Sequence, residues 1–195
     1  MAKIGESVRI KRIAITGVPG SGKSTVAKIF EESGAYRVDA DEITHRLLNQ
    51  DSQLRQQIKN EFGQEVFSGN LRDNLAKVVF SDPVKLQRLE KIIHPKIIQH
   101  LLSEMKEAEK QHKLCVAEVP LLFEVNWEKY FDATICVTAT SSLCLNRFGK
   151  GEEEYKKRTA RQLSQADKAR RADHVLENNQ NMQTLKTHIE DLGIK

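Results

Sequence analysis

The chain has 195 residues, of which 39% are hydrophobic and 30% are charged, and its formal net charge is +4. This length suffices for one domain, or for one core with insertions, that buries a hydrophobic interior. No apolar run approaches the ~20 residues of a membrane span, and residues 1–12 lack the apolar region and cleavage site of an export signal, so we expect neither a membrane protein nor an exported one.

The cysteines and the charges favour a cytoplasmic protein with a polyphosphate ligand. Cys115, Cys136 and Cys144 form neither a CxxC pair nor a disulfide framework, which suits buried thiols in a reducing compartment. Lysines and arginines concentrate beside acidic residues and form no continuous basic tail, so nucleic acid is not the expected partner. The six histidines form no metal-ligand pattern, and no structural metal is expected.

The first predicted elements are a strand, a glycine-rich loop and a helix. Residues 8–16 (VRIKRIAIT) alternate and then become continuously apolar, which predicts a buried strand. Residues 24–32 have the apolar spacing of a helix that packs on a sheet. A second short strand is predicted at residues 35–38, and helical spacing resumes after it.

The middle of the chain predicts a helical insertion. Residues 51–113 are predominantly helical in pattern and too long for a simple crossover between parallel strands. Because proline interrupts helices, His94-Pro95 predicts a junction between two helices. Apolar strands at residues 114–117 and 134–137 follow, and helical stretches then lead to the C-terminus.

The sequence GVPGSGKS at residues 17–24 matches the phosphate-binding pattern G-x-x-x-x-G-K-[ST]. Its glycines allow backbone N–H groups to face phosphate oxygens, and the following helix N-terminus favours negative charge. Lys23 is predicted to reach the β- and γ-phosphates of ATP and Ser24 to ligate Mg²⁺. A plain glycine-rich turn is the alternative, which the strand and helix on either side disfavour. The predicted ATP-binding residues are Gly20, Ser21, Gly22, Lys23, Ser24 and Thr25.

This loop predicts a P-loop NTPase-type fold, a three-layer α/β/α arrangement with a parallel central sheet. Kinases, GTPases and motor ATPases share the loop. The chain contains no guanine-reading N-K-x-D sequence and is short for a motor ATPase. A small-molecule kinase is therefore the favoured class, and an ATP-binding regulatory or RNA-associated protein that has lost transfer is the alternative from another class.

Two aspartates follow the second predicted strand. In extended geometry the carboxylates of Asp39 and Asp41 would point the same way, toward the carboxyl edge of the sheet. Asp41 is predicted to accept the proton of the attacking hydroxyl, or to hold a water of Mg²⁺. The alternative is that Asp41 caps a helix that begins at Glu42.

Basic residues concentrate between Arg147 and Arg171. Most are expected to be solvated helix charges in i,i+4 pairs. One or two are expected to close over the transferring phosphoryl group, as kinases of this architecture require, but the residues alone do not say which.

Taken together, the motifs resemble the dephospho-CoA kinase family from the loop to Asn179. Beyond the loop, the resemblance rests on DAD (39–41), LAKVVFSD (75–82), HP (94–95), VPLLFE (119–124), RQ (161–162) and ADHVLEN (172–178). Glu118 departs from the pattern, because this family often has Asp or an apolar residue there.

The resemblance implies ATP- and Mg²⁺-dependent phosphorylation of the ribose 3′-hydroxyl of dephospho-CoA, which gives coenzyme A and ADP. It implies that Asp41 is the catalytic base, that Thr16 and Arg72 contact the substrate, and that Arg147 is the catalytic arginine of a lid. It also implies that the AD-x-V-x-x-N stretch (residues 172–178) is the loop that borders the adenine. Another small-molecule P-loop kinase, of the nucleoside, nucleotide or shikimate type, is the alternative.

The resemblance further implies a three-part organisation. The nucleotide-binding core comprises residues 8–50, 114–142 and 172–195, the helical CoA-binding region residues 51–113, and the lid residues 143–171. We expect a monomer or small homo-oligomer with no nucleic-acid or membrane partner.

Overall fold

The computed structural model describes residues 11–79 and 82–194. Residues 8–10 of the first predicted strand and residues 80–81 of the LAKVVFSD motif lie outside the described residues. The chain divides into two compact units. The first unit comprises Met1–Val38 and Met105–Lys195, and the second comprises Asp39–Glu104.

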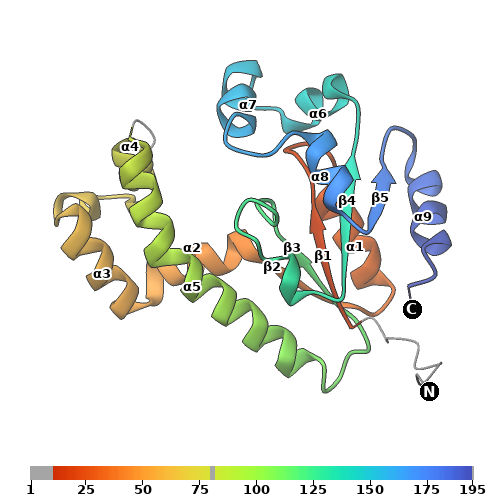
Figure 1. The fold of residues 1–195 in the computed structure, drawn as a ribbon, viewed down its shortest axis with the longest axis horizontal. Helices are drawn as coiled ribbons and strands as arrows, with labels where there is room; N and C mark the ends of the chain where they lie inside the picture. The colour runs from red at the N-terminus through yellow and green to blue at the C-terminus, as the bar shows by residue number, and fades with distance from the viewer. Residues whose placement is uncertain (1–10, 80–81, 195) are drawn as a thin grey trace, which may run out of the picture. The chain divides into compact units, whose positions relative to one another are not determined.

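The strands form one five-stranded sheet in the order β2-β3-β1-β4-β5 (Figure 1). β1 pairs in parallel with β3 and with β4, and β4 pairs in parallel with β5. This arrangement confirms the predicted parallel α/β fold. The strands are β1 (Arg12–Thr16), β2 (Tyr36–Asp39), β3 (Cys115–Glu118), β4 (Ala133–Thr138) and β5 (His174–Glu177).

Strand β5 corrects part of the prediction for residues 172–178, which were expected to form a loop. Leu176 is the strand's buried residue, at 2% exposure, while Val175 is 49% exposed. One buried side chain in four residues is too weak a pattern to predict a strand. Backbone pairing with β4 stabilises the strand instead.

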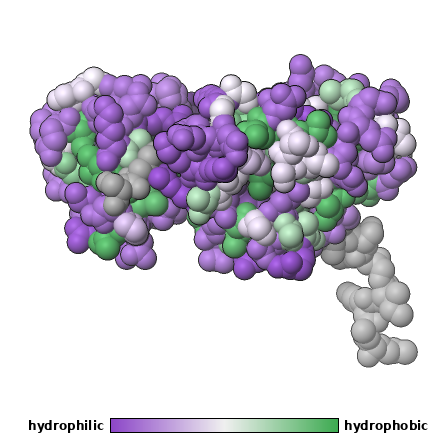
Figure 2. Space-filling model, turned by 90° about the horizontal axis from the view of Figure 1, so that it is seen from above, coloured by the Kyte–Doolittle hydropathy of each residue, from purple (hydrophilic) through white to green (hydrophobic). Residues whose placement is uncertain are grey.

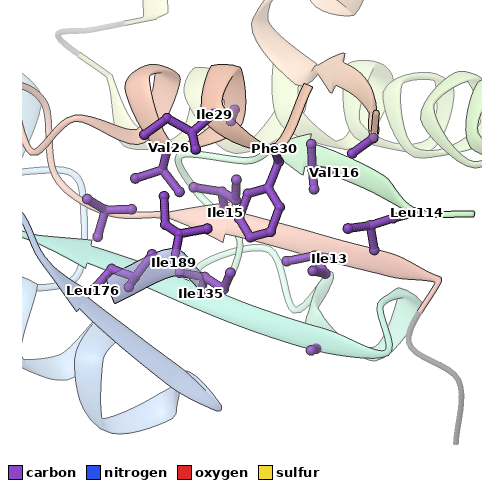
Figure 3. Close-up of a cluster of buried hydrophobic side chains, with 14 of the residues drawn as sticks. Ile13, Ile15, Val26, Ile29, Phe30, Leu114, Val116, Ile135, Leu176 and Ile189 are labelled. Atoms are coloured by element: carbon purple, nitrogen blue, oxygen red, sulfur yellow. The ribbon is translucent and has the colours of Figure 1, made fainter. Parts of the chain in front are cut away.

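Two layers of helices cover the sheet. On one face, α1 (Lys23–Glu32) and α9 (Met182–Asp191) bury apolar side chains against β1, β3 and β4 (Figure 3). On the other face lies α8 (Gln165–Arg171), because Cys136 points away from the side of Ile135 and is near Lys168. The first unit also contains η2 (Glu128–Tyr130), α6 (Ser141–Phe148) and α7 (Glu152–Thr159).

All three cysteines are buried and unpaired, as predicted. Burial raises the pKa of Cys115 and of Cys136 to about 11, so both are thiols at neutral pH.

The second unit is helical. It contains α2 (Ala40–Gln50), α3 (Ser52–Phe62), η1 (Glu65–Phe67), α4 (Leu71–Val79) and most of α5 (Pro83–Ala108). Helix α3 begins where the side chain of Asp51 accepts a hydrogen bond from the Leu54 N–H, and it ends at Gly63, which has a positive φ.

The predicted helix junction at His94-Pro95 is wrong, because α5 continues through Pro95. A proline inside a helix removes one backbone hydrogen bond and costs about 3 kcal/mol. Leu89, Ile93 and Ile97 are each buried, so one apolar stripe runs past the proline on both sides. Burial of each such side chain contributes about 1.5–3 kcal/mol, and together they offset the interruption.

Hydrophilic residues cover most of the face drawn in Figure 2. Among the described residues, the large hydrophobic side chains that are exposed are Val84, Val175 and Met182. None of the helices formed by residues 11–79 and 82–194 is long and apolar enough to cross a membrane.

Candidate active site

The glycine-rich loop leaves the carboxyl end of β1, which lies between β3 and β4 in the sheet. Helix α1 begins at Lys23, one residue earlier than predicted. Its N-cap residue is Gly22, in the left-handed conformation with φ 101°, and this residue provides no side-chain cap. No side chain caps the start of α1, and the N-terminus of a helix is a place where proteins bind phosphate.

All three glycines of the loop have close neighbours, and a Cβ at Gly17 would lie 2.4 Å from the backbone O of Val137. A Cβ at Gly20 would lie 2.0 Å from the backbone O of Cys144 in α6, and Gly20 has a φ of +75°. A Cβ at Gly22 would lie 2.1 Å from Nδ2 of Asn178. The loop is thus held between α6 and the residue that follows β5, and its glycines are required by close packing as well as by backbone conformation.

Gly20→Ala should weaken ATP binding by about tenfold, because the added Cβ would meet the backbone carbonyl of Cys144, the buried residue of α6, and the loop must move away from it. Titration with a fluorescent ATP analogue measures the change.

Gly34→Ala is the matched control. Gly34 also has a positive φ, +97°, but no atom lies within 4 Å of its added Cβ. We expect a loss of about 1 kcal/mol of stability and unchanged ATP affinity. Equal effects of the two substitutions on ATP binding would contradict the packing explanation.

Lys23 lies along the loop that precedes it. Its Nζ donates a hydrogen bond of 3.0 Å to the carbonyl O of Val18. The ammonium group is therefore held at the loop, where the sequence places the phosphates.

Ser24 contacts a residue that the sequence analysis did not assign to the site. Its Oγ donates a hydrogen bond of 2.7 Å to Oε2 of Glu118, the last residue of β3. Glu118 is 3% exposed, and its Oε1 accepts from Arg37 of β2, with 2.8 Å to Nε and 2.6 Å to Nη2. The sequence did contain a signal for this role of Glu118, an acidic residue at the end of a predicted apolar strand. In P-loop enzymes an acidic residue at the end of a strand holds Mg²⁺.

Thr16 ends β1 directly before the loop and is fully buried. Its Oγ1 donates to the carbonyl O of Pro120 at 3.3 Å. The Nζ of Lys168 donates to the same carbonyl, so Thr16 and α8 share one acceptor.

Arg147 and Asn178 form a chain of contacts that ends at the loop. Nη1 of Arg147 donates to the carbonyl O of Asn178 at 2.8 Å, and Nδ2 of Asn178 donates to the carbonyl O of Ser21 at 2.9 Å. Asn178 is 8% exposed. The motif residue that was expected to border adenine is therefore in contact with the phosphate loop.

Another residue of the same motif, Asp173, has a different position. Its Oδ2 accepts from the backbone N–H and the hydroxyl of Thr134, at 2.8 and 2.7 Å. This pair fastens the start of β5 to β4.

Most basic residues between Arg147 and Arg171 are exposed, as predicted, and Lys156 and Arg158 form i,i+4 pairs. On α7, Lys156 pairs with Glu152 at 2.6 Å, and both side chains are exposed. Lys168 is the exception, because it is fully buried and its Nζ lies 2.9 Å from Oε1 of Glu124. Burial lowers the pKa of Lys168, and the neighbouring Glu124 partly opposes that shift.

In the second unit, the first turn of α2 corrects the prediction for the two aspartates. Asp39 is the N-cap, and its Oδ1 accepts from the N–H of Asp41 at 2.8 Å and from that of Glu42 at 3.4 Å. The helix begins at Ala40, so Asp41 is helical and the expectation of two parallel carboxylates on an extended strand is wrong. The alternative that Asp41 is the cap is also wrong. Its own side chain is exposed.

Arg72 lies in the first turn of α4, in the same unit as Asp41. Its backbone N–H donates to Oδ1 of Asn70 at 3.0 Å, and its side chain is exposed. The first unit thus contains the loop, Thr16 and Arg147, and the second contains Asp41 and Arg72.

Comparison with known proteins identifies the family. A family model described as dephospho-CoA kinase matches residues 11–184. A dephospho-CoA kinase of Protochlamydia amoebophila is 38% identical over 194 residues, which cover 95% of this chain and 96% of the relative.

Solved structures share the fold of this chain. A crystal structure of the protein TT1252 from Thermus thermophilus has a TM-score of 0.82 and 33% identity, covering 94% of this chain and 96% of that one. A shikimate kinase from Acinetobacter baumannii has a TM-score of 0.54 and 17% identity over 95% and 93% of the two chains, which shows a shared fold alone. The family model and the relative do not favour the alternative of another small-molecule P-loop kinase, of the nucleoside, nucleotide or shikimate type. The chain belongs to the dephospho-CoA kinase family.

Proposed function

We propose that the enzyme transfers the γ-phosphoryl group of ATP to the ribose 3′-hydroxyl of dephospho-CoA, giving coenzyme A and ADP, with Mg²⁺ as the metal. The observation that carries the proposal is the glycine loop in front of α1 with Ser24 hydrogen-bonded to Glu118, in a chain of this family. Phosphoryl transfer depends mainly on positioning and on electrostatic stabilisation, and this loop supplies both.

The residues fit a magnesium ion. Ser24 donates its hydroxyl proton to Glu118, which leaves the oxygen lone pairs of Ser24 for a cation. Mg²⁺ in such sites is bound by one or two protein groups together with substrate phosphates and waters, so Ser24 and Glu118 would hold it. When bound, the ion neutralises charge that develops on the β- and γ-phosphates.

The chain's own groups would hold and orient the nucleotide. The N–H groups at the start of α1 would bind phosphate oxygens of ATP, and Lys23 would neutralise charge on the β- and γ-phosphates. Gly20, Ser21, Gly22 and Thr25 complete the proposed ATP site. Arg147, which already contacts the residue that braces the loop, would stabilise the transferring group.

Asp41 would act as general base on the 3′-hydroxyl. It follows β2 by two residues, and Asp39 rather than Asp41 fulfils the capping requirement of α2. Its side chain is exposed, and a positioned carboxylate can accept the proton of an attacking hydroxyl. Thr16 and Arg72 would contact the acceptor.

The proposed organisation keeps residues 51–113 as the CoA-binding region, residues 143–171 as the lid, and the remainder from residue 8 as the nucleotide-binding core. We place the enzyme in the cytoplasm, because its three unpaired buried thiols suit a reducing compartment. We propose a monomer or small homo-oligomer without nucleic-acid or membrane partners.

An ADP-release assay with dephospho-CoA, adenosine, AMP and shikimate as separate acceptors tests the function. Turnover should occur with dephospho-CoA and stay near background with the other three. Lys23→Ala should weaken phosphate binding and transfer, because it removes the cation of the loop. ATP binding without turnover on any acceptor would refute the proposal, and preferential turnover of another acceptor would assign the enzyme to a different substrate.

A further inference from the structure

An ion pair beside the loop connects two neighbouring strands. Arg37 is in β2, Glu118 is in β3, and these strands are adjacent in the sheet. Both Nε and Nη2 of Arg37 bind Oε1 of Glu118. The side chain of Glu118 is 4% exposed and that of Arg37 is 26% exposed.

The two oxygens of Glu118 have separate partners. Oε1 is bound by Arg37, and Oε2 accepts the proton of Ser24. A guanidinium group presents its N–H donors in a rigid fork, so it fixes the direction of the carboxylate as well as its charge. Rotation of the Glu118 side chain would break both interactions at once.

This arrangement determines which way the Ser24 hydroxyl points. A hydroxyl has one proton and two lone pairs, and a proton donated to Glu118 cannot be directed toward a cation. Without an anchored acceptor, the hydroxyl could rotate its proton into the position that a metal ion would occupy. A nearly buried carboxylate also needs a compensating charge, which Arg37 provides.

We propose that Arg37 is a positioning residue of the metal site, which holds Glu118 so that Ser24 presents its lone pairs to Mg²⁺. This inference rests on the proposed function, but it assigns a role to a residue that contacts neither nucleotide nor acceptor in that proposal.

Arg37→Gln should weaken the binding of the divalent cation by about tenfold, while the affinity for metal-free ATP remains within about twofold. Mn²⁺ is the probe, since its free form is measured by electron paramagnetic resonance. The titration contains a non-hydrolysable ATP analogue and no acceptor, so it does not depend on turnover. In steady-state assays, saturating Mg²⁺ should restore most of the kcat of the variant.

The control variant is Arg12→Gln. Arg12 forms the other half-buried arginine pair of the same sheet, with Glu109, and its side chain is also 26% exposed. Its partner does not contact the loop, so Mn²⁺ binding should match that of the wild type. Arg37→Lys keeps the charge but lacks the fork, and we expect about threefold weaker Mn²⁺ binding.

A double-mutant cycle tests whether Arg37 acts through Glu118. In the background of Glu118→Gln, Arg37→Gln should cause no further loss of Mn²⁺ affinity. Additive losses would overturn the inference, as would wild-type Mn²⁺ affinity in Arg37→Gln. If Arg37→Gln does not fold, wild-type affinity in Arg37→Lys overturns it equally. Failure of the wild-type protein to bind Mn²⁺ with the ATP analogue would instead refute the proposed function.

Discussion

Asp41→Asn should lower kcat by about 10²-fold or more, while the affinity for ATP changes little. The amide has nearly the shape of the carboxylate but cannot accept the proton of the 3′-hydroxyl. Helix α2 should be preserved, because its cap is the side chain of Asp39, which accepts from the backbone of Asp41 and not from its side chain. Steady-state kinetics with dephospho-CoA and a separate ATP titration measure the two quantities.

Glu42→Gln is the matched control for this substitution. Glu42 is the next residue of the same first turn, it is exposed, and it carries the same charge. Removal of the Glu42 charge should alter the interaction with the helix dipole about as much as Asp41→Asn does. We expect near-normal turnover. Near-normal turnover in Asp41→Asn as well would remove the base assignment, and the proton would then leave by another route.

Lys168→Met should destabilise the protein by about 3–5 kcal/mol. The ammonium group of Lys168 is fully buried, and it binds both Glu124 and the carbonyl O of Pro120. Methionine fills a similar volume but leaves the carboxylate of Glu124 without its cation. Urea unfolding followed by the fluorescence of Trp127, the one tryptophan of the chain, measures the loss.

Two further variants separate the buried charge from general effects of methionine. Lys156→Met removes an exposed lysine whose pair with Glu152 is solvated, and its unfolding curve should match that of the wild type. Lys168→Met combined with Glu124→Gln should recover part of the lost stability, because the uncompensated charge is gone. A double variant as unstable as the sum of its parts would show that the pair is not the cause.

Local sequence patterns predicted the central strands and the loop correctly. Residues 13–15 are continuously apolar and occupy the middle of the sheet, where both faces are covered. The loop's glycine spacing is itself the chemistry of phosphate binding. Both features depend on short stretches of chain, so they can be recognised without knowledge of the rest of the fold.

The features that the sequence did not reveal depend on contacts between distant residues. The pairs of Glu118 with Arg37 and with Ser24 are 81 and 94 residues apart in the chain, and they require the strand order of the sheet. Lys168 looks like one more charge on a basic helix until α8 is placed over Pro120. Continuation of α5 through Pro95 depends on apolar packing along the whole helix rather than on the local residue type.

The prediction for the start of α2 failed for a different reason. The spacing of Asp39 and Asp41 suggested an extended segment, but an aspartate at the end of a strand also starts a helix efficiently. The structure uses Asp39 in that way, so the helix begins at Ala40, two residues before the predicted start at Glu42.

The close packing around the phosphate loop affects both nucleotide binding and the substitutions that the loop can tolerate. Cys144 and Asn178 pack against the loop, and Lys23 binds the carbonyl O of Val18 within it, so a nucleotide should meet a preformed surface and little ordering entropy should oppose its binding. The same contacts leave no space for a β-carbon at Gly20 or Gly22. A side chain at either glycine should therefore cost ATP affinity, whatever its chemical type.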